Sequence, residues 1–233
     1  MAKKGFTLIL LILLAVILIK NITLLDFQPE LNPTATRYAE KGPEEVGAAN
    51  LVTAVIVTYR GLDTLGEVTI LFLTASIIGF FLQTREKSNI SRKTRATSEI
   101  LETAGKVLTP LIFLFGVYVF INGHLTPGGG FQGGAIVASG LVLMLLSNPA
   151  KKVRHVTLSV IESISGFAFI VLAVLGIFLA GGFFDNAYLG LGEFGTLLSA
   201  GAIPIIYIFI GLKVGSELSG IVSNLQETQK EEL

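Results

Sequence analysis

Six long apolar runs, separated by short polar segments, constrain this chain more than any other feature. A helix of ~20 mostly apolar residues is needed to cross the ~30 Å hydrocarbon core of a bilayer. Only 15% of the residues are charged, against about 25% in a typical soluble domain. We therefore predict an all-α integral membrane protein with about six transmembrane helices. The expected spans are residues 6–23, 64–83, 103–121, 131–146, 156–180 and 194–215.

Three further segments require separate expectations. Residues 46–58 are apolar but too short to cross alone, so they predict an interfacial helix, a re-entrant piece or the first half of a broken helix that continues into 64–83. Residues 6–23 follow a basic start, as in a signal peptide, but no small-residue cleavage pattern follows, so we expect a retained anchor. Residues 26–45 are polar and contain three prolines, which predicts an extended loop.

Basic residues in the short loops predict the orientation, because cytoplasmic loops carry the excess of Lys and Arg. With six spans, eleven basic residues fall on the side that holds both termini and four on the other. Lys106 and Lys213 are left out of this count because they lie inside predicted spans. We therefore expect a multi-pass cell-membrane protein with both termini in the cytoplasm, surrounded by the lipid bilayer.

Composition excludes several classes of chemistry. The chain has no cysteine, which excludes disulfides, thiolate metal sites, Cys-ligated iron–sulfur clusters and Cys nucleophiles. It has only two histidines, too few for a His-rich metal or haem site. The formal net charge is zero, so binding of nucleic acid is not expected. Ser139 and Ser199 have no recognisable base partner in the sequence, and we predict no catalytic, cofactor-binding or metal-ligating residue.

Ionisable groups within the apolar runs are the candidate functional residues, because burying a charge in a bilayer is costly. Glu162 is the deepest, about six residues or ~9 Å into its span. It should be protonated, paired with a cation or exposed to a hydrated cavity. Lys106 and Lys213 are expected near the same membrane surface, where they could snorkel or pair with Glu162. Glu67 and His124 belong to the opposite layer and complete the five ion-path candidates.

Between these two layers the sequence offers only hydroxyl groups. A relay for protons or ions normally needs ionisable or hydrated groups across the middle of the membrane. The incomplete relay argues against a self-sufficient transporter. It favours a subunit that borders a path shared with partners, or one that mainly scaffolds. The hydroxyl residues are Thr74, Ser76, Tyr118, Ser139, Ser199 and Tyr207.

A glycine-rich loop is the densest local motif. It holds one proline and five glycines within eight residues, which cannot begin an ordinary helix. We interpret it as a tight turn with close helix packing, with ion access involving the nearby His124 as the alternative. It is not a phosphate-binding loop, because no GKS or GKT follows and no strand precedes it. The loop residues are Pro127, Gly128, Gly129, Gly130, Phe131, Gln132, Gly133 and Gly134.

Residues 100–222 resemble the MnhB-type (MrpB) subunit of multisubunit Mrp sodium/proton antiporters. The resemblance is carried by the glycine-rich loop with Gly123 and His124 before it, and by four spans at this spacing. It is also carried by the run Thr103-Ala104-Gly105-Lys106 with Pro110 after it.

Residues 6–85 resemble the small hydrophobic module at the C-terminal end of the large Mrp antiporter subunit, which is a separate subunit in archaeal membrane-bound hydrogenases. This resemblance is carried by residues 54–67, above all by the run from Tyr59 to Glu67. The two resemblances imply a fusion of module 1–90, with two spans, and module 91–233, with four. The seam between them is expected within the polar loop 85–97.

The resemblance implies an accessory membrane subunit of an Mrp-type module that exchanges sodium for protons, without a cofactor of its own. Its partners would be other Mrp-type subunits in a large membrane complex. Detachment of the first module from the large subunit favours a redox-driven complex, of the membrane-bound hydrogenase or sulfur-reducing type, whose redox arm holds iron–sulfur and metal centres. A subunit of a free Mrp antiporter and a purely structural adaptor are the alternatives.

Overall fold

The computed structural model describes residues 2–24, 30–83, 97–151 and 153–232, and every regular element in these ranges is a helix. Six of the helices are long and apolar enough to cross a membrane. The prediction of an all-α protein with six spans is therefore confirmed. The elements are α1 (Ala2–Thr23), α2 (Pro33–Val46), α3 (Leu51–Thr53), the π-helix η1 (Ala54–Tyr59), α4 (Gly61–Gln83), α5 (Glu99–Ile121), α6 (Gly130–Ser147), α7 (His155–Leu179), the 3₁₀-helix η2 (Ala187–Leu189) and α8 (Ile203–Glu232).

The chain divides into two compact units, Met1–Arg37 and Tyr38–Leu233. The first unit contains α1, whose membrane-spanning part has no buried residue. A helix that is apolar on all sides is either buried in the core of a large protein or spans a membrane. Helix α1 by itself therefore indicates a membrane environment.

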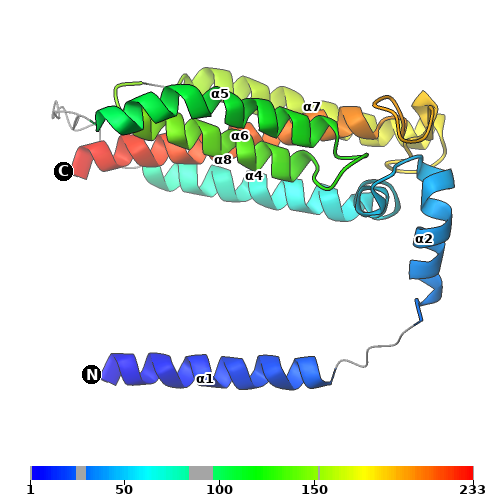
Figure 1. Ribbon diagram of the computed structural model, residues 1–233, viewed down its shortest axis with the longest axis horizontal. Coiled ribbons are helices and arrows are strands. Elements are labelled where there is room, and N and C mark those ends of the chain that lie inside the picture. Colours follow the sequence, from blue (N-terminus) through cyan, green and yellow to red (C-terminus); the bar gives the residue numbers. More distant parts are fainter. Residues whose placement is uncertain (1, 25–29, 84–96, 152, 233) are drawn as a thin grey trace. The chain divides into compact units, whose positions relative to one another are not determined.

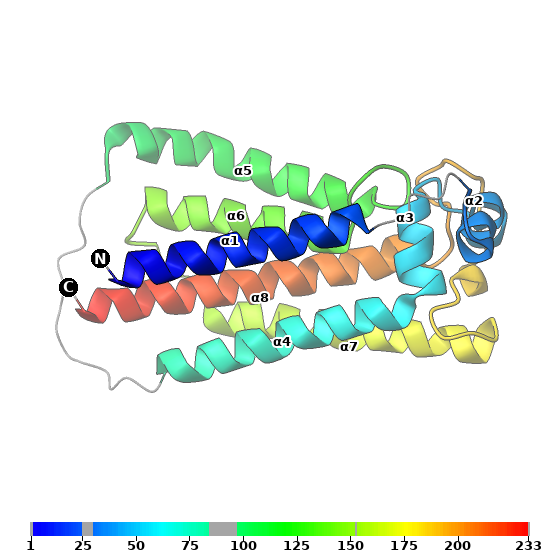
Figure 2. The same ribbon diagram turned by 90° about the horizontal axis from the view of Figure 1, so that it is seen from below.

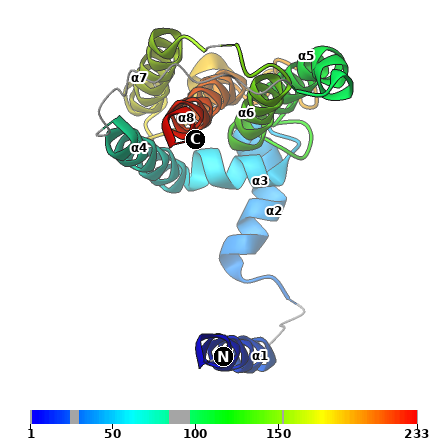
Figure 3. The same ribbon diagram turned by 90° about the vertical axis from the view of Figure 1, so that its left-hand side faces the viewer.

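The second unit is a bundle of α4, α5, α6, α7 and α8, with α8 at its centre (Figure 1). Helix α8 packs against each of the other four. Seen along its axis, α8 lies between α4, α6 and α7, and α5 lies on the far side of α6 (Figure 3). The share of buried residues follows this arrangement: 56% of the spanning part of α8 is buried, against 6% for α4.

Different segments of the chain lie at the two ends of the bundle (Figure 2). At the end we call the loop end lie α3, the loop 122–129 and the segment 180–202. At the other, which we call the C-terminal end, α5 and α7 begin and α4, α6 and α8 finish. The polar loop 84–96, which contains almost all of the expected seam 85–97, lies outside the described residues.

The predicted sixth span was placed too early in the chain. Residues 194–202 are not helical, and Gly195, Ala200 and Gly201 have positive φ angles of 83°, 62° and 54°. These conformations are incompatible with a right-handed helix. Helix α8 therefore begins at Ile203, with Pro204 in its first turn, where a missing N–H is tolerated. Its spanning part runs on to Gln226 instead of ending at 215.

The segment 26–45, expected as an extended loop, is also different, because helix α2 occupies residues 33–46 and includes Pro43. The short apolar segment 46–58 divides between the end of α2, a non-helical stretch at 47–50, and the helical run α3–η1. The hydroxyl of Thr64 in α4 donates to the carbonyl of Ile56 in η1 at 2.6 Å. Residues 51–59 are thus joined through Arg60 to α4, as in a broken helix.

One apolar core joins parts of the chain that were assigned to different modules. Its members come from residues 46–68, from α7, from the segment 180–202 and from α8, so residues 38–83 and 97–226 share a single compact unit. This packing does not test the ancestry of the modules, and the division into 1–90 and 91–233 stays a prediction. The buried core side chains are Val46, Ala48, Ala54, Val57, Val68, Phe169, Ala173, Phe184, Ala200, Ala202, Ile203, Ile206, Tyr207, Ile210 and Val214.

Glycines at the start of α6 bring its backbone against two neighbours. A Cβ atom on Gly133 would lie 2.6 Å from the carbonyl oxygen of Gly116 in α5. A Cβ atom on Gly134 would lie 2.8 Å from both the Gly211 carbonyl oxygen and the Val214 Cβ in α8. Real Cβ atoms do not approach so closely, and the opposing atoms belong to helix backbones or lie next to them. Small residues permit this close approach of membrane helices.

We predict that Gly134→Ala destabilises the protein by about 1–3 kcal/mol, the usual range for an overpacked helix contact. Gly66→Ala in α4 is the matched control, because a Cβ atom there meets nothing within 4 Å. Both changes raise helix propensity equally, so their difference reports the contact. The measurement is the thermal unfolding midpoint of the purified assembly. Equal midpoints for the two variants would refute the close-packing interpretation.

Candidate functional site

Helix α8 carries a buried ion pair near the middle of its membrane span. The ammonium of Lys213 lies 2.5 Å from Oε1 of Glu217, one helical turn further along. Their side chains are only 8% and 0% exposed. Lys213 is ten residues from Ile203 and thirteen from Gln226, or ~15 and ~20 Å from the two ends of the span. At this depth a lysine cannot reach the membrane surface by snorkelling.

Two neighbouring helices enclose the lysine side chain. The ring of Phe72 in α4 lies 4.9 Å from the ammonium nitrogen, a cation–π arrangement. On α7, a Cβ atom on Gly166 would lie 3.3 Å from Cδ and 3.6 Å from Nζ of Lys213. The absent side chain of Gly166 therefore leaves the space that the lysine stem fills. The position of Lys213 is set jointly by α4, α7 and α8.

Only one of the two carboxylate oxygens of Glu217 has a hydrogen-bond partner among the described residues. Oε1 accepts the hydrogen bond from Lys213, but Oε2 is buried and has no hydrogen-bond partner in the described part of the chain. The adjacent hydroxyl of Ser216 donates to the backbone carbonyls of Leu212 and Lys213 and not to the carboxylate. A buried polar atom without a partner is energetically unfavourable. Oε2 is therefore the unsatisfied group of the site.

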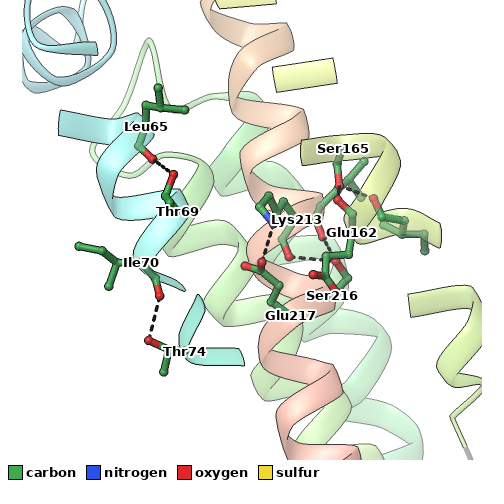
Figure 4. Close-up of polar contacts among 11 residues, drawn as sticks. Leu65, Thr69, Ile70, Thr74, Glu162, Ser165, Lys213, Ser216 and Glu217 are labelled. Carbon is green, nitrogen blue, oxygen red and sulfur yellow. Dashed lines mark hydrogen bonds and ion pairs between the residues drawn. The ribbon is translucent and has the colours of Figure 1, made fainter. Parts of the chain in front are cut away.

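A polar pocket of about 280 Å³ lies between α4, α7 and α8 and reaches Glu217. Glu162 of α7 lines the same pocket and interacts electrostatically with Glu217. Figure 4 shows Glu162 on α7 beside Lys213, Ser216 and Glu217 of α8. The lining residues are Ala75, Ser76, His155, Leu158, Ser159, Glu162, Ser216, Glu217, Gly220, Ile221 and Asn224.

Nearby hydroxyl groups are occupied within their own helices. The hydroxyls of Thr69 and Thr74 each donate to the carbonyl four residues earlier in α4, at 2.8 Å (Figure 4). The hydroxyl of Ser165 donates to the carbonyls of Ile161 and Glu162 in α7. These groups do not bridge to the ion pair. The ionisable groups at the inner part of the site are Lys213, Glu217 and Glu162, and His155 lines the outer end of the pocket.

The structure alters three expectations about these charges. Lys106 pairs with Glu102 on α5 at 2.7 Å, and both side chains are largely exposed. Lys213 pairs with Glu217, so Glu162 forms no ion pair among the residues that the structure describes. The expectation of only hydroxyl groups in mid-membrane was wrong, because α8 begins later than predicted and carries Lys213 to the centre. Glu217 was overlooked because the predicted span ended at 215, although its i, i+4 spacing from Lys213 was visible in the sequence.

Glu67 lies in a different part of the bundle from this pocket. It is six residues into α4, ~9 Å from the helix start at the loop end. Its side chain is exposed on the outside of the bundle. Closer to the helix start, Arg60 and Asp63 form an exposed ion pair at 2.5 Å. Glu67 therefore points toward whatever surrounds this chain in the membrane.

His124 is buried at the loop end, within a network of hydrogen bonds. Its Nε2 lies 3.3 Å from the carbonyl oxygen of Thr196. Asn50 donates to the carbonyls of Gly123 and Thr126 at 2.8 and 2.9 Å. Burial lowers the pKa of His124, although the surrounding carbonyl groups partly oppose this shift. The residue is therefore a neutral, enclosed histidine, far along the bundle from Glu162 and Glu217.

The same hydrogen-bond network extends to the centre of the bundle. The hydroxyl of Thr53 donates to the carbonyl of Gly123 at 2.7 Å and accepts from the hydroxyl of Tyr207 at 2.9 Å. Residues of α3, the glycine-rich loop and α8 are thereby joined. Within the described residues, no cluster of three or more His, Cys, Asp or Glu side chains could hold a metal ion.

Comparison with known proteins identifies relatives of the chain. The family described as a domain related to the MnhB subunit of Na⁺/H⁺ antiporter matches residues 100–220. One of the subunits of a Na⁺/H⁺ antiporter from Bacillus subtilis is 43% identical over 81 residues, which are 35% of this chain and 51% of the bacterial protein. The match thus spans about half the length of the Bacillus protein.

Two solved structures share the fold over nearly the whole chain. One is a chain of the membrane-bound sulfane sulfur reductase, an archaeal respiratory membrane complex, with 39% identity and a TM-score of 0.80. The alignment covers 97% of this chain and 98% of that one. The other is a chain of the Mrp complex from a Dietzia species, with 23% identity and a TM-score of 0.77, covering 96% of this chain and 26% of that one. The second likeness concerns the fold alone.

We predict that acid weakens the fold through His124. Its pKa is lowered in the folded protein, so below the ordinary value of about 6.5 the unfolded chain binds more protons and stability falls as the pH drops. His124→Gln should flatten the dependence of the unfolding midpoint between about pH 5 and about pH 8. His155→Gln, at the other histidine, serves as the control. An unchanged dependence in His124→Gln would contradict the assignment.

Proposed function

Because the chain belongs to the family of domains related to the MnhB subunit of Na⁺/H⁺ antiporters, we propose that it is an accessory membrane subunit of an Mrp-type sodium/proton antiporter module. The module would be part of a redox-driven respiratory complex. The observation that carries this proposal is the full-length match, at 39% identity, to a chain of the membrane-bound sulfane sulfur reductase. The chain would be non-catalytic, with the redox chemistry located in other subunits.

The surface of the chain supports a place among other membrane subunits. No residue in the spanning part of α1 and only 6% of that of α4 is buried. Glu67, a carboxylate within the spanning part of α4, also faces outward. Exposure of a charged group to lipid is unfavourable, so a partner subunit or a hydrated path should meet it. We propose other Mrp-type subunits as these partners.

The five predicted ion-path residues do not form one site. Glu162 lines the polar pocket, and Lys213 pairs with Glu217, which lines it too; we propose that these three residues belong to the ion route. Glu67 would contribute where α4 meets a partner. Lys106 is paired and exposed, and His124 is enclosed. For these last two residues we favour structural roles.

Membership of a free Mrp antiporter is the second candidate function. The 43% identity to a stretch of the Bacillus subtilis antiporter protein favours it. A purely structural adaptor fits less well, because a scaffold has no need of an ion pair buried in mid-membrane. Replacing such a pair by apolar residues is often neutral or stabilising.

We also propose that both termini are cytoplasmic. Eleven basic residues in the loops, tails and span ends belong to the side of the two termini and four to the opposite side. Five of the eleven lie in residues 84–96, outside the described part of the chain. Under the positive-inside rule this asymmetry supports a cytoplasmic location for the C-terminal end of the bundle.

Co-purification tests the proposed function. A tag on the C-terminus, extraction in a mild detergent and mass spectrometry should recover antiporter-like subunits together with iron–sulfur proteins. An unrelated tagged membrane protein from the same cells is the control for detergent carry-over. Antiporter-like subunits without redox proteins would indicate the free antiporter. A stable solitary chain would disprove the accessory-subunit assignment.

Thiol labelling tests the orientation, since the chain has no cysteine of its own. We expect Leu198→Cys, at an 83% exposed position of the loop end, to react with a membrane-impermeant maleimide on intact cells. Ala150→Cys, exposed at the C-terminal end, should react only after the membrane is permeabilised. Labelling of denatured samples shows that both thiols are reactive. The reverse pattern would overturn the proposed topology.

A further inference from the structure

We propose that Glu217 is a proton-binding group, reached by water through the polar pocket from the C-terminal end of the bundle. Its role in ion exchange rests on the proposed function of the chain, whereas its protonation can be measured directly. The proposal stands on three observations: the unsatisfied oxygen of Glu217, the charge balance around it and the one-sided access to it.

The net charge of the cluster favours the binding of one proton. The site combines one cation, Lys213, with two carboxylates, Glu217 and Glu162, that line one pocket. With all three ionised the cluster carries a net negative charge within the membrane span. An uncompensated charge in a medium of low dielectric constant is strongly unfavourable. A single proton on the carboxylate pair brings the cluster to neutrality.

The geometry selects the oxygen that takes the proton. Oε1 of Glu217 is held by the Lys213 ammonium. Oε2 is buried, lacks a partner in the described residues and belongs to a side chain that lines the pocket. A proton or a water molecule at Oε2 would satisfy this atom. Glu162, which is half-buried, lies across the same pocket and can exchange the proton with it.

The pocket connects this carboxylate to the C-terminal end of the bundle. Its lining begins at His155, the first residue of α7, and at Asn224 on α8. Glu162 is seven residues along α7 from His155, and Glu217 is seven residues along α8 from Asn224. Both intervals correspond to ~10 Å. A volume of about 280 Å³ holds several waters, each of which occupies ~30 Å³ in the liquid.

Access stops beyond the lysine. On the loop-end side of Lys213, Ile206 and Ile210 of α8 are 1% exposed and belong to the continuous apolar core. Helix α4 contributes Ala75 and Ser76 to the pocket, and neither is titratable. The groups that can influence the proton are therefore His155 and Glu162 from α7 and Lys213 from α8. Among the residues that the structure describes, the pocket is a one-sided entrance and not a channel.

A metal cation fits this site less well than a proton. An ion at Oε2 would lie next to the ammonium of Lys213, which already occupies the other oxygen of the same carboxylate. Two positive charges a few ångströms apart repel each other strongly in a buried site. The hydroxyl of Ser216, which also lines the pocket, already donates to its own helix. We therefore assign the site to a proton.

Carbodiimide labelling of the intact complex tests the protonation. Dicyclohexylcarbodiimide is apolar and reacts with a protonated carboxyl group. The carboxyl oxygen bonds to the central carbon of the carbodiimide, and the proton passes to one of its nitrogens. Peptide mass spectrometry should locate the adduct on Glu217, with a yield that rises as the pH falls. Glu102, in the exposed i, i+4 pair with Lys106, is the internal comparison and should remain unmodified. This measurement uses the unaltered chain and does not depend on a variant.

Exchange by the complex reconstituted in liposomes provides the second readout. We expect Glu217→Gln to lower sodium-dependent proton flux by about tenfold or more, with the subunit composition unchanged. The matched control Glu102→Gln removes the carboxylate of the exposed pair and should leave the flux near that of the wild type.

The possible results separate the two proposals. Absence of labelling at every pH, or labelling that sodium ions block without any pH dependence, overturns the proton assignment. Wild-type flux in an assembled Glu217→Gln complex overturns its role in exchange. Lack of sodium/proton exchange by the wild-type complex refutes the proposed function instead, while the labelling still decides whether Glu217 binds a proton.

Discussion

An ion pair in the middle of an apolar bundle requires surroundings that hold its two charges together and keep lipid away from them, and this constraint organises the second unit of the chain. The ammonium of Lys213 and one oxygen of Glu217 satisfy each other. Phe72 and Gly166 close around the lysine from α4 and α7. Such burial is tolerated only where the geometry is favourable and the remaining polar atoms find partners. The central position of α8 among four other helices provides that geometry.

Close backbone contact makes the central position of α8 attainable. Helix α6 approaches both α5 and α8 through Gly133 and Gly134, where any side chain would collide with a neighbouring backbone. In a bilayer there is no hydrophobic force between helices comparable to that in water, so packing of this kind carries much of the association. The loop-end hydrogen bonds of Asn50 and Thr53 then attach the residues before α4 to the same bundle.

The polar pocket and the exposed helices are both explained if this chain borders an ion path that it shares with other subunits. The pocket reaches Glu217 from the C-terminal end but is blocked by apolar side chains beyond Lys213. Ion movement through the whole membrane would therefore need groups from other subunits. The outward-facing Glu67 and the exposed surfaces of α1 and α4 offer places where such subunits can meet this chain. An accessory subunit that borders a shared path accounts for both features.

The sequence by itself determined the all-α class, the six spans and the resemblance to the MnhB subunit, because each depends on local composition or on a contiguous motif. It also singled out Glu162 as a charge that needs a cation, a proton or a hydrated cavity. The start of α8 was decided by backbone conformation at Gly195, Ala200 and Gly201, which hydropathy does not report. The pairing of Lys213 with Glu217, the enclosure of His124 and the pocket depended on tertiary structure. They arise from contacts between helices far apart in sequence, and only packing fixes which faces of those helices meet.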